Sequence, residues 1–209
     1  MAAQLEFYTH PMSRGRIVRW MLEEVGAPYG THVLEYGASM KAPEYLAINP
    51  LGKVPALRHG GAVVTEVAAI CAYLADAFPD AGLAPPARAR AAYYRWMFFA
   101  AGPLEAATTN QALGVEVPEE RRGMVGYGPL PTLLDALAAA ISANDYIAGD
   151  RFSAADVYVG SHLNWGLRFG TLQARPEFDA YLRRILERDA YHRANALDDA
   201  LLPPRDADR

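Results

Sequence analysis

The sequence has a single cysteine, Cys71, among 209 residues, so it cannot form an internal disulfide. It also lacks a run of about 18 apolar residues, the length that a membrane-spanning helix needs. Gln4 and Glu6 interrupt the apolar start that a secretory signal peptide would require. These absences predict a protein of a reducing compartment, the cytoplasm, with no membrane partner.

The chain also lacks an excess of either charge and any clustering of metal ligands. Charged residues make up 21% of the sequence and the formal net charge is −4, which argues against the strongly basic surface that binds nucleic acid. No two of its five histidines are three to five positions apart, so no metal site is expected. Neither a G-x-G-x-x-G nor a P-loop motif occurs, and a nucleotide cofactor has no support.

What the sequence does contain is one change of pattern, at a Pro/Gly-rich linker over residues 79–86. Before it, residues 1–78 show the order strand, helix, strand, two hairpin strands, helix. After it, residues 87–209 have helical periodicity throughout, with Pro103 expected to kink or break the first helix. The order βαβ followed by ββα predicts an α/β thioredoxin-like N-terminal domain, and the remainder an all-α C-terminal domain.

The most informative stretch begins with an Asn-Pro-Leu-Gly turn at residues 49–52. A short apolar strand follows and opens with Val54-Pro55. Two glycines then reverse the chain into a second strand, and Glu66 opens an amphipathic helix. A proline at a strand start cannot donate to the ladder. If this X-Pro bond is cis, the main chain of Val54 would face sideways, where an extended peptide could pair with it in β fashion.

These features resemble the soluble, cytosolic-type bacterial glutathione S-transferase family. Residues 5–13 (LEFYTHPMS) resemble the family's first strand and active-site loop, and residues 19–26 (RWMLEEVG) its first helix with the glycine that ends it. Residues 152–157 (FSAADV) are similar to the motif that begins a C-terminal helix. The resemblance spans nearly the whole chain. It implies the glutathione S-transferase fold, a homodimer, and glutathione as co-substrate without a metal.

The resemblance implies two candidates for the group that stabilises the glutathione thiolate. Ser13 comes first, because its distance from the end of the first strand matches the serine-type branches of the family. Its alternative role is to cap the first predicted helix, whose apolar face it directly precedes. Tyr8 is second, because other branches of the family use a tyrosine at the end of the first strand, although a strand tyrosine also suits the core. Arg14 or Arg16 would add a positive field if its side chain turned toward the loop.

The resemblance also implies a glutathione-binding set. Glu66 would accept the α-amino group of the γ-glutamyl unit, although a first-turn carboxylate also suits the helix dipole without any ligand. In most members the next residue is a serine that binds the γ-glutamyl carboxylate; here it is Val67, which keeps only the amide. Two lysines would contact the glycyl carboxylate, with a solvated surface role as the alternative for each. The full set is Lys41, Lys53, Val54, Pro55, Glu66 and Val67.

Aromatic residues at positions 93–99 nearly surround the helix expected at Ala87–Leu113, which indicates either a partner surface or an apolar pocket besides the core. We expect an electrophile pocket lined by Met12, Tyr94, Phe98 and Trp165. The same helix would contribute to a two-fold dimer interface. Cys71 lies on the apolar face of its helix and is expected to be a small buried side chain, not a nucleophile.

One motif is expected to stabilise the start of a helix and to take no part in binding or catalysis. Ser153 and Asp156 have the spacing of a capping box, in which the serine begins the helix and the carboxylate accepts the main-chain N–H of the serine. Losing such a cap costs about 0.5–2 kcal/mol.

The sequence therefore predicts a detoxifying glutathione S-transferase that activates the glutathione thiol for attack on a small apolar electrophile. Isomerisation and peroxide reduction are side activities that the same thiolate could support. The alternative is a non-catalytic ligand-binding or regulatory module of the same fold, which Val67 favours. No motif identifies the electrophile.

Overall fold

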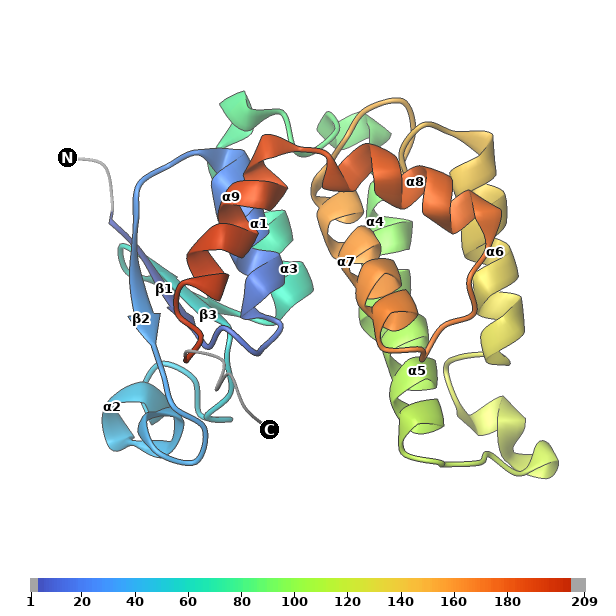
Figure 1. Ribbon diagram of the computed structural model, residues 1–209, viewed down its shortest axis with the longest axis horizontal. Coiled ribbons are helices and arrows are strands. Elements are labelled where there is room, and N and C mark those ends of the chain that lie inside the picture. Colours follow the sequence, from blue (N-terminus) through green and yellow to red (C-terminus); the bar gives the residue numbers. More distant parts are fainter. Residues whose placement is uncertain (1–3, 204–209) are drawn as a thin grey trace. The chain divides into compact units, whose positions relative to one another are not determined.

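The computed structural model describes residues 4–203, which form two compact units (Figure 1). The first unit extends to Ala81 and includes the chain again from Arg188 onward. The second unit is Gly82–Glu187. Each unit has its own set of packed elements, α/β in the first and helical in the second.

The first unit is built on a four-stranded mixed sheet with the strand order β2-β1-β3-β4. Its strands are β1 (Leu5–Thr9), β2 (Tyr29–Val33), β3 (Ala56–His59) and β4 (Ala62–Thr65). β1 pairs in parallel with β2 and antiparallel with β3, and β3 forms the predicted hairpin with β4. This is the thioredoxin-like arrangement that the order of elements predicts.

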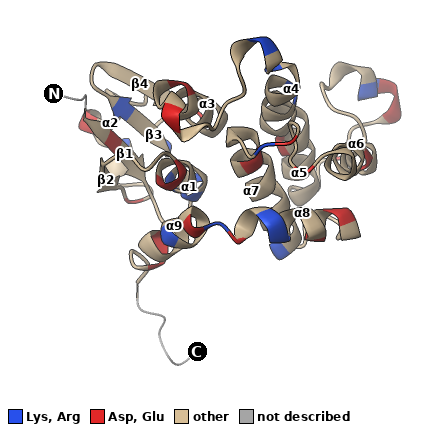
Figure 2. Cartoon of the chain, turned by 90° about the horizontal axis from the view of Figure 1, so that it is seen from above, with Lys and Arg blue, Asp and Glu red and all other residues tan. Residues whose placement is uncertain are grey.

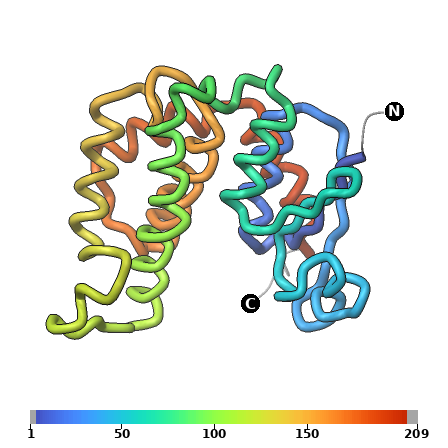
Figure 3. Tube along the Cα trace, turned by 180° about the vertical axis from the view of Figure 1, so that it is seen from behind, coloured from blue at the N-terminus to red at the C-terminus, as the bar shows by residue number. Residues whose placement is uncertain are grey.

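Side chains of β1 alternate between two buried faces of the sheet. Phe7 points toward the long helices, whereas Tyr8 points to the opposite face and packs with Met40 and Tyr45. The long helices are α1 (Gly15–Val25) and α3 (Val67–Ala77), which contact each other (Figures 1 and 3). The opposite face is covered by the short helices η1 (Ser39–Lys41) and α2 (Pro43–Leu46), which the sequence patterns do not predict.

The last helix differs from the predicted division of the chain. The sequence predicts one helical domain over residues 87–209, but α9 (Asp189–Asp199) packs along α1 in the first unit (Figures 1 and 2). A buried ion pair joins the two helices, with 2.7 Å between Arg19 Nε and Asp198 Oδ1. Charges so far apart in the chain leave no local pattern, which is why helical periodicity could not assign α9 to this unit.

The second unit contains only helices and their connections. They are η3 (Ala87–Ala89), α4 (Ala91–Phe99), η4 (Ala100–Leu104), α5 (Glu105–Ala112), η5 (Glu119–Met124), α6 (Leu130–Ala143), α7 (Ala154–Arg168) and α8 (Pro176–Leu186). Pro103 lies in η4, a π-helical turn that joins α4 to α5. The expected interruption of this helix is therefore one widened turn.

The predicted capping box is present at the start of α7 and is part of a larger network. Asp156 Oδ2 accepts the main-chain N–H of Ser153 at 2.9 Å. Its other oxygen accepts the N–H of Ile147 at 2.8 Å and the hydroxyl of Tyr181 at 2.9 Å. Burial raises the pKa of Asp156 to about 6, against the opposing effect of these hydrogen bonds.

Three further observations concern membrane spans, metal ligands and the cysteine. Within residues 4–203, none of the helices has the length and apolar character needed to cross a membrane, and no cluster of three or more His, Cys, Asp or Glu side chains is arranged to hold a metal ion. Cys71 is fully buried, and burial raises the pKa of its thiol well above the usual range. The thiol therefore stays protonated and serves as a small apolar side chain, as predicted.

Candidate functional site

The candidate site of the first unit lies at one edge of its sheet. The parallel strands β1 and β2 end there, at Thr9 and Val33. The antiparallel strand β3 begins there at Ala56, and β4 ends there at Thr65, because each of these residues belongs to the last pair of its ladder. The topology thus brings four chain segments that are distant in sequence to a common edge.

The strand register sets two predicted segments side by side. Because the final pair of the β3–β4 ladder joins the start of one strand to the end of the other, the residues just outside it are neighbours. These residues are Val54 and Pro55 before β3, and Glu66 and Val67 after β4. The hairpin therefore gathers four of the six predicted glutathione-binding residues.

Two side chains that the sequence patterns did not identify hold the Val54 segment in place. The Tyr45 hydroxyl and the Asn49 amide donate to the carbonyl of Lys53, at 2.6 Å and 2.7 Å. Burial raises the pKa of Tyr45 to about 12, so its phenol stays a donor. The Val54–Pro55 bond is cis, as predicted, and among residues 4–203 the main chain of Val54 has no hydrogen-bond partner. The Asn-Pro-Leu-Gly turn at residues 49–52 was the sequence feature that could have indicated this supporting role of Asn49.

Glu66 has a backbone conformation that side-chain-bearing residues rarely adopt. Its φ is 66° and its ψ is 121°, and it is the one non-glycine residue with a positive φ in the described part of the chain. Such strain costs of order 1–3 kcal/mol and is found mainly at functional sites. The first intrahelical bond of α3 runs from the Ile70 N–H to the Glu66 carbonyl, so the N–H of Val67 precedes the ladder. This helix end suits a carboxylate.

The hydroxyl of Ser13 has a partner on each side. It donates to the carbonyl of His10 at 2.7 Å and accepts the N–H of Gly15 at 2.9 Å. The N-cap of α1 is Arg14, so Ser13 lies one residue before the cap and supports the helix start by accepting the N–H of Gly15, the first residue of α1. Its hydroxyl must leave the His10 carbonyl to donate elsewhere. The loop is tightly packed, because a Cβ on Gly15 would lie 2.0 Å from Thr9 Oγ1.

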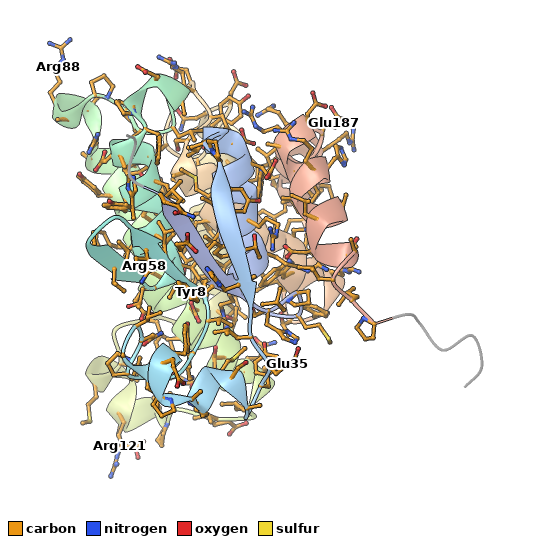
Figure 4. All side chains as sticks on the ribbon, turned by 90° about the vertical axis from the view of Figure 1, so that its left-hand side faces the viewer. Tyr8, Glu35, Arg58, Arg88, Arg121 and Glu187 are labelled. Atoms are coloured by element: carbon orange, nitrogen blue, oxygen red, sulfur yellow. The ribbon has the colours of Figure 1, made fainter. Side chains whose placement is uncertain are left out.

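Tyr8 is a residue of β1 in the first unit, and its buried side chain packs with Met40 and Tyr45 on one face of the sheet (Figure 4). Only 7% of the residue is exposed, and its ring is stacked on His32 with 4.6 Å between ring centroids. The ring of Tyr45 lies at 5.7 Å. This is the core position that the sequence left open for Tyr8, and its role toward a thiolate stays a prediction.

The two predicted lysines differ in what they contact. The Lys41 ammonium donates to the Leu51 carbonyl at 2.9 Å and lies over Gly52, where a Cβ would come within 2.8 Å of Nζ. Gly52 has a φ of 58°, so both its conformation and this close approach require glycine. Lys53 is exposed, and its main-chain carbonyl holds the bonds described above.

The four residues predicted to line an electrophile pocket belong to different units. Met12, in the first unit, is 73% exposed, and its N–H donates to His10 Nδ1 at 3.1 Å. Tyr94 and Phe98 are exposed on α4 and Trp165 is half-buried on α7, all in the second unit. Their grouping around one substrate stays a prediction.

Two protein-family models match separate parts of this chain. Residues 12–77 match the model of the glutathione S-transferase N-terminal domain, and residues 129–189 match that of the C-terminal domain. Glutathione S-transferase GST-4.5 of Xanthomonas campestris pv. campestris is 31% identical over 195 residues, covering 87% of this chain and 93% of that protein.

Solved structures of whole proteins are also similar to this chain. A glutathione transferase from Methylococcus capsulatus str. Bath has a TM-score of 0.78 at 28% identity, covering 94% of this chain and 99% of the other. A sphingomonad glutathione S-transferase complexed with glutathione has a TM-score of 0.76 at 26% identity, covering 93% and 98%.

Proposed function

Because the chain belongs to the glutathione S-transferase family, we propose that it binds glutathione at the sheet edge and activates the thiol for attack on a small apolar electrophile. One observation carries the proposal: the main chain of Val54, which has no hydrogen-bond partner within residues 4–203, lies beside the strained Glu66 at the start of α3. The sphingomonad relative that was solved with glutathione supports the choice of co-substrate. A detoxifying role in the cytoplasm is consistent with this substrate class.

In the proposed complex the tripeptide lies along this edge. Its cysteinyl unit pairs with the main chain of Val54 as an added strand. Its γ-glutamyl ammonium lies at Glu66, and the neighbouring carboxylate lies at the Val67 amide, in the positive field of the α3 N-terminus. The glycyl carboxylate lies toward Lys41 and Lys53. The sulfur then lies near the start of α1.

The free energies involved make thiolate formation feasible. A thiol with a pKa of about 8.5 must drop by roughly two units to ionise at neutral pH, which corresponds to about 2.7 kcal/mol. A hydrogen bond from Ser13 to the charged sulfur supplies roughly 1.5–3 kcal/mol. The dipole of α1 adds about 0.3–1 kcal/mol. The protein thereby supplies an ionised and positioned nucleophile.

The alternative is a non-catalytic binding or regulatory module, and two observations favour it. Val67 lacks the hydroxyl that most members offer to the γ-glutamyl carboxylate. The hydroxyl of Ser13 already donates within its own loop. Titration calorimetry with glutathione, followed by a screen of electrophiles, distinguishes the two functions. Binding without turnover of any electrophile would favour the module, and absence of binding would refute the proposed enzyme.

We predict that Ser13→Ala lowers turnover at neutral pH and has less effect at high pH, where the thiolate forms unaided. The bound thiol loses one donor, so its pKa rises and the pH–rate profile moves to higher pH. Glutathione binding persists, because most proposed contacts lie elsewhere. The measurement is the pH–rate profile with a chromogenic electrophile.

Tyr8→Phe is the matched variant, because it also removes one hydroxyl. A shifted profile for this variant, with an unchanged one for Ser13→Ala, would transfer the role to Tyr8. Unchanged profiles for both would leave the main-chain amides at the α1 N-terminus as the stabilising groups.

We further predict a two-fold dimer to which α4 contributes. Phe98 is 71% exposed and Tyr94 lies on the same helix, a surface that a partner subunit would cover. Light scattering should give twice the chain mass at micromolar concentration, and Phe98→Glu should shift the protein toward the monomer. A wild-type protein that scatters as a monomer would refute the prediction.

A further inference from the structure

One arginine of α1 connects the active-site loop to the last helix of the chain. Arg16 Nε donates to the carbonyl of Pro11 at 2.6 Å. Its Nη2 lies 2.5 Å from Asp199 Oδ1, and its Nη1 donates to Asn195 Oδ1 at 3.2 Å. The three nitrogens of the planar Arg16 guanidinium group thus contact a loop carbonyl and two side chains of α9. The single ammonium group of a lysine could not make these three contacts together.

The contact with Pro11 bears directly on Ser13. Pro11 is buried and lies between His10, whose carbonyl accepts the Ser13 hydroxyl, and Ser13 itself. Fixing the Pro11 carbonyl therefore limits how the loop can place the hydroxyl. The side chain of Arg16 turns toward the loop, which is the condition under which a positive field was expected, and its pairing with Asp199 adds a geometric role to that expected field.

We propose that Arg16 is a positioning residue for thiolate activation, and that α9 completes the site by holding Arg16 through Asp199 and Asn195. The inference rests on the proposed function. It assigns α9 a part in the chemistry although the helix contributes no group to the reacting atoms. The observation behind it is that the first unit contains the C-terminal helix, which packs on α1 (Figure 2).

Three other ion pairs join α1 to α9 or to Arg188, the residue before α9. Their α1 residues lie further along that helix, and these pairs do not reach the loop. Their N–O distances are 2.7 Å for Arg19–Asp198, 2.7 Å for Arg188–Glu24 and 3.0 Å for Arg193–Glu23. These pairs hold the C-terminal segment on α1 whether or not Arg16 is present. Arg193 and Asp199 both have largely exposed side chains, so removing either pair should have a similarly small effect on stability. Arg193→Gln is therefore a matched control.

The test compares Arg16→Lys, Asp199→Asn and Arg193→Gln by two measurements. The first is hydrogen–deuterium exchange of residues 10–16 without glutathione, which reports the hydrogen bonds made by the main-chain N–H groups of Ser13 and Gly15. The second is the pH–rate profile together with separate kcat and KM values for glutathione. We expect severalfold faster exchange and about tenfold lower kcat for Arg16→Lys and Asp199→Asn, since small misplacements of reacting groups are costly. KM should change little, and Arg193→Gln should behave as wild type.

Equal effects from Arg193→Gln and Asp199→Asn would overturn the proposal, because they would show only general loosening of α9. Wild-type exchange in Arg16→Lys would also overturn it. If wild type binds no glutathione, the proposed function fails, and the exchange measurement alone still decides whether α9 fixes the loop.

Discussion

Replacing Asp156 by alanine is expected to lower the free energy of unfolding by about 3–5 kcal/mol. The carboxylate is the acceptor for the N–H of Ile147, the N–H of Ser153 and the hydroxyl of Tyr181. Each buried donor left without an acceptor costs about 1–3 kcal/mol. The capping box alone predicts only about 0.5–2 kcal/mol, and the additional donors account for the larger value.

Urea unfolding followed by circular dichroism measures this effect. Ser153→Ala is the control, because it removes the capping hydroxyl and leaves the carboxylate with its other donors; its expected cost is about 1 kcal/mol. If both variants lose the same small amount of stability, Asp156 acts as a cap only. Glutathione affinity should be unaffected where both variants are folded, since neither residue belongs to the proposed site.

The same residue should leave a signature in the pH dependence of stability. Burial raises the pKa of Asp156 from its ordinary value of 3.8 to about 6. The folded state therefore holds a proton that the unfolded chain has lost, so unfolding becomes easier as pH rises from about 4 to about 6. This group contributes a fall of about 3 kcal/mol over that range. In Asp156→Asn that contribution should vanish, and a wild-type slope retained in the variant would contradict the assignment.

The second large effect is expected at Glu66, where binding and stability should change in opposite directions. Glu66→Gly removes the carboxylate that receives the ammonium, and glutathione affinity should fall by about 2 kcal/mol or more, roughly thirtyfold. The same change relieves a positive φ that costs about 1–3 kcal/mol, less about 0.5–1 kcal/mol for the flexibility of glycine. The free energy of unfolding of the variant should therefore be about 1 kcal/mol higher than that of the wild type, although the variant binds glutathione poorly.

Glu66→Gln separates the two contributions, because it keeps the strained backbone and removes only the charge. It should lose affinity like the glycine variant but keep wild-type stability. Calorimetry with glutathione and thermal unfolding of the three proteins provide the comparison. Wild-type affinity in Glu66→Gly would remove Glu66 from the proposed site, and equal stability of the two variants would show that the backbone strain is no larger than the roughly 0.5–1 kcal/mol that glycine flexibility costs.

Local patterns predicted much of this molecule. Alternating and helical periodicities located the strands and most helices, and the spacing of Ser153 and Asp156 predicted the capping box. The Asn-Pro-Leu-Gly turn followed by Val54-Pro55 predicted a special backbone before β3, and the bond is cis. Such features depend on residues a few positions apart, and short-range sterics and hydrogen bonding are visible in sequence.

The sequence by itself thus determined the order of elements, the family and the segments from which a site could be built. Only the tertiary structure decided which side chains support those segments. Tyr45 and Asn49 hold the Lys53 carbonyl, and Arg16 connects the Ser13 loop to α9. The backbone of Glu66 is likewise set by the hairpin and the helix on either side of it. These contacts join residues by the register of a sheet and the packing of helices, and a chain read in one dimension contains neither.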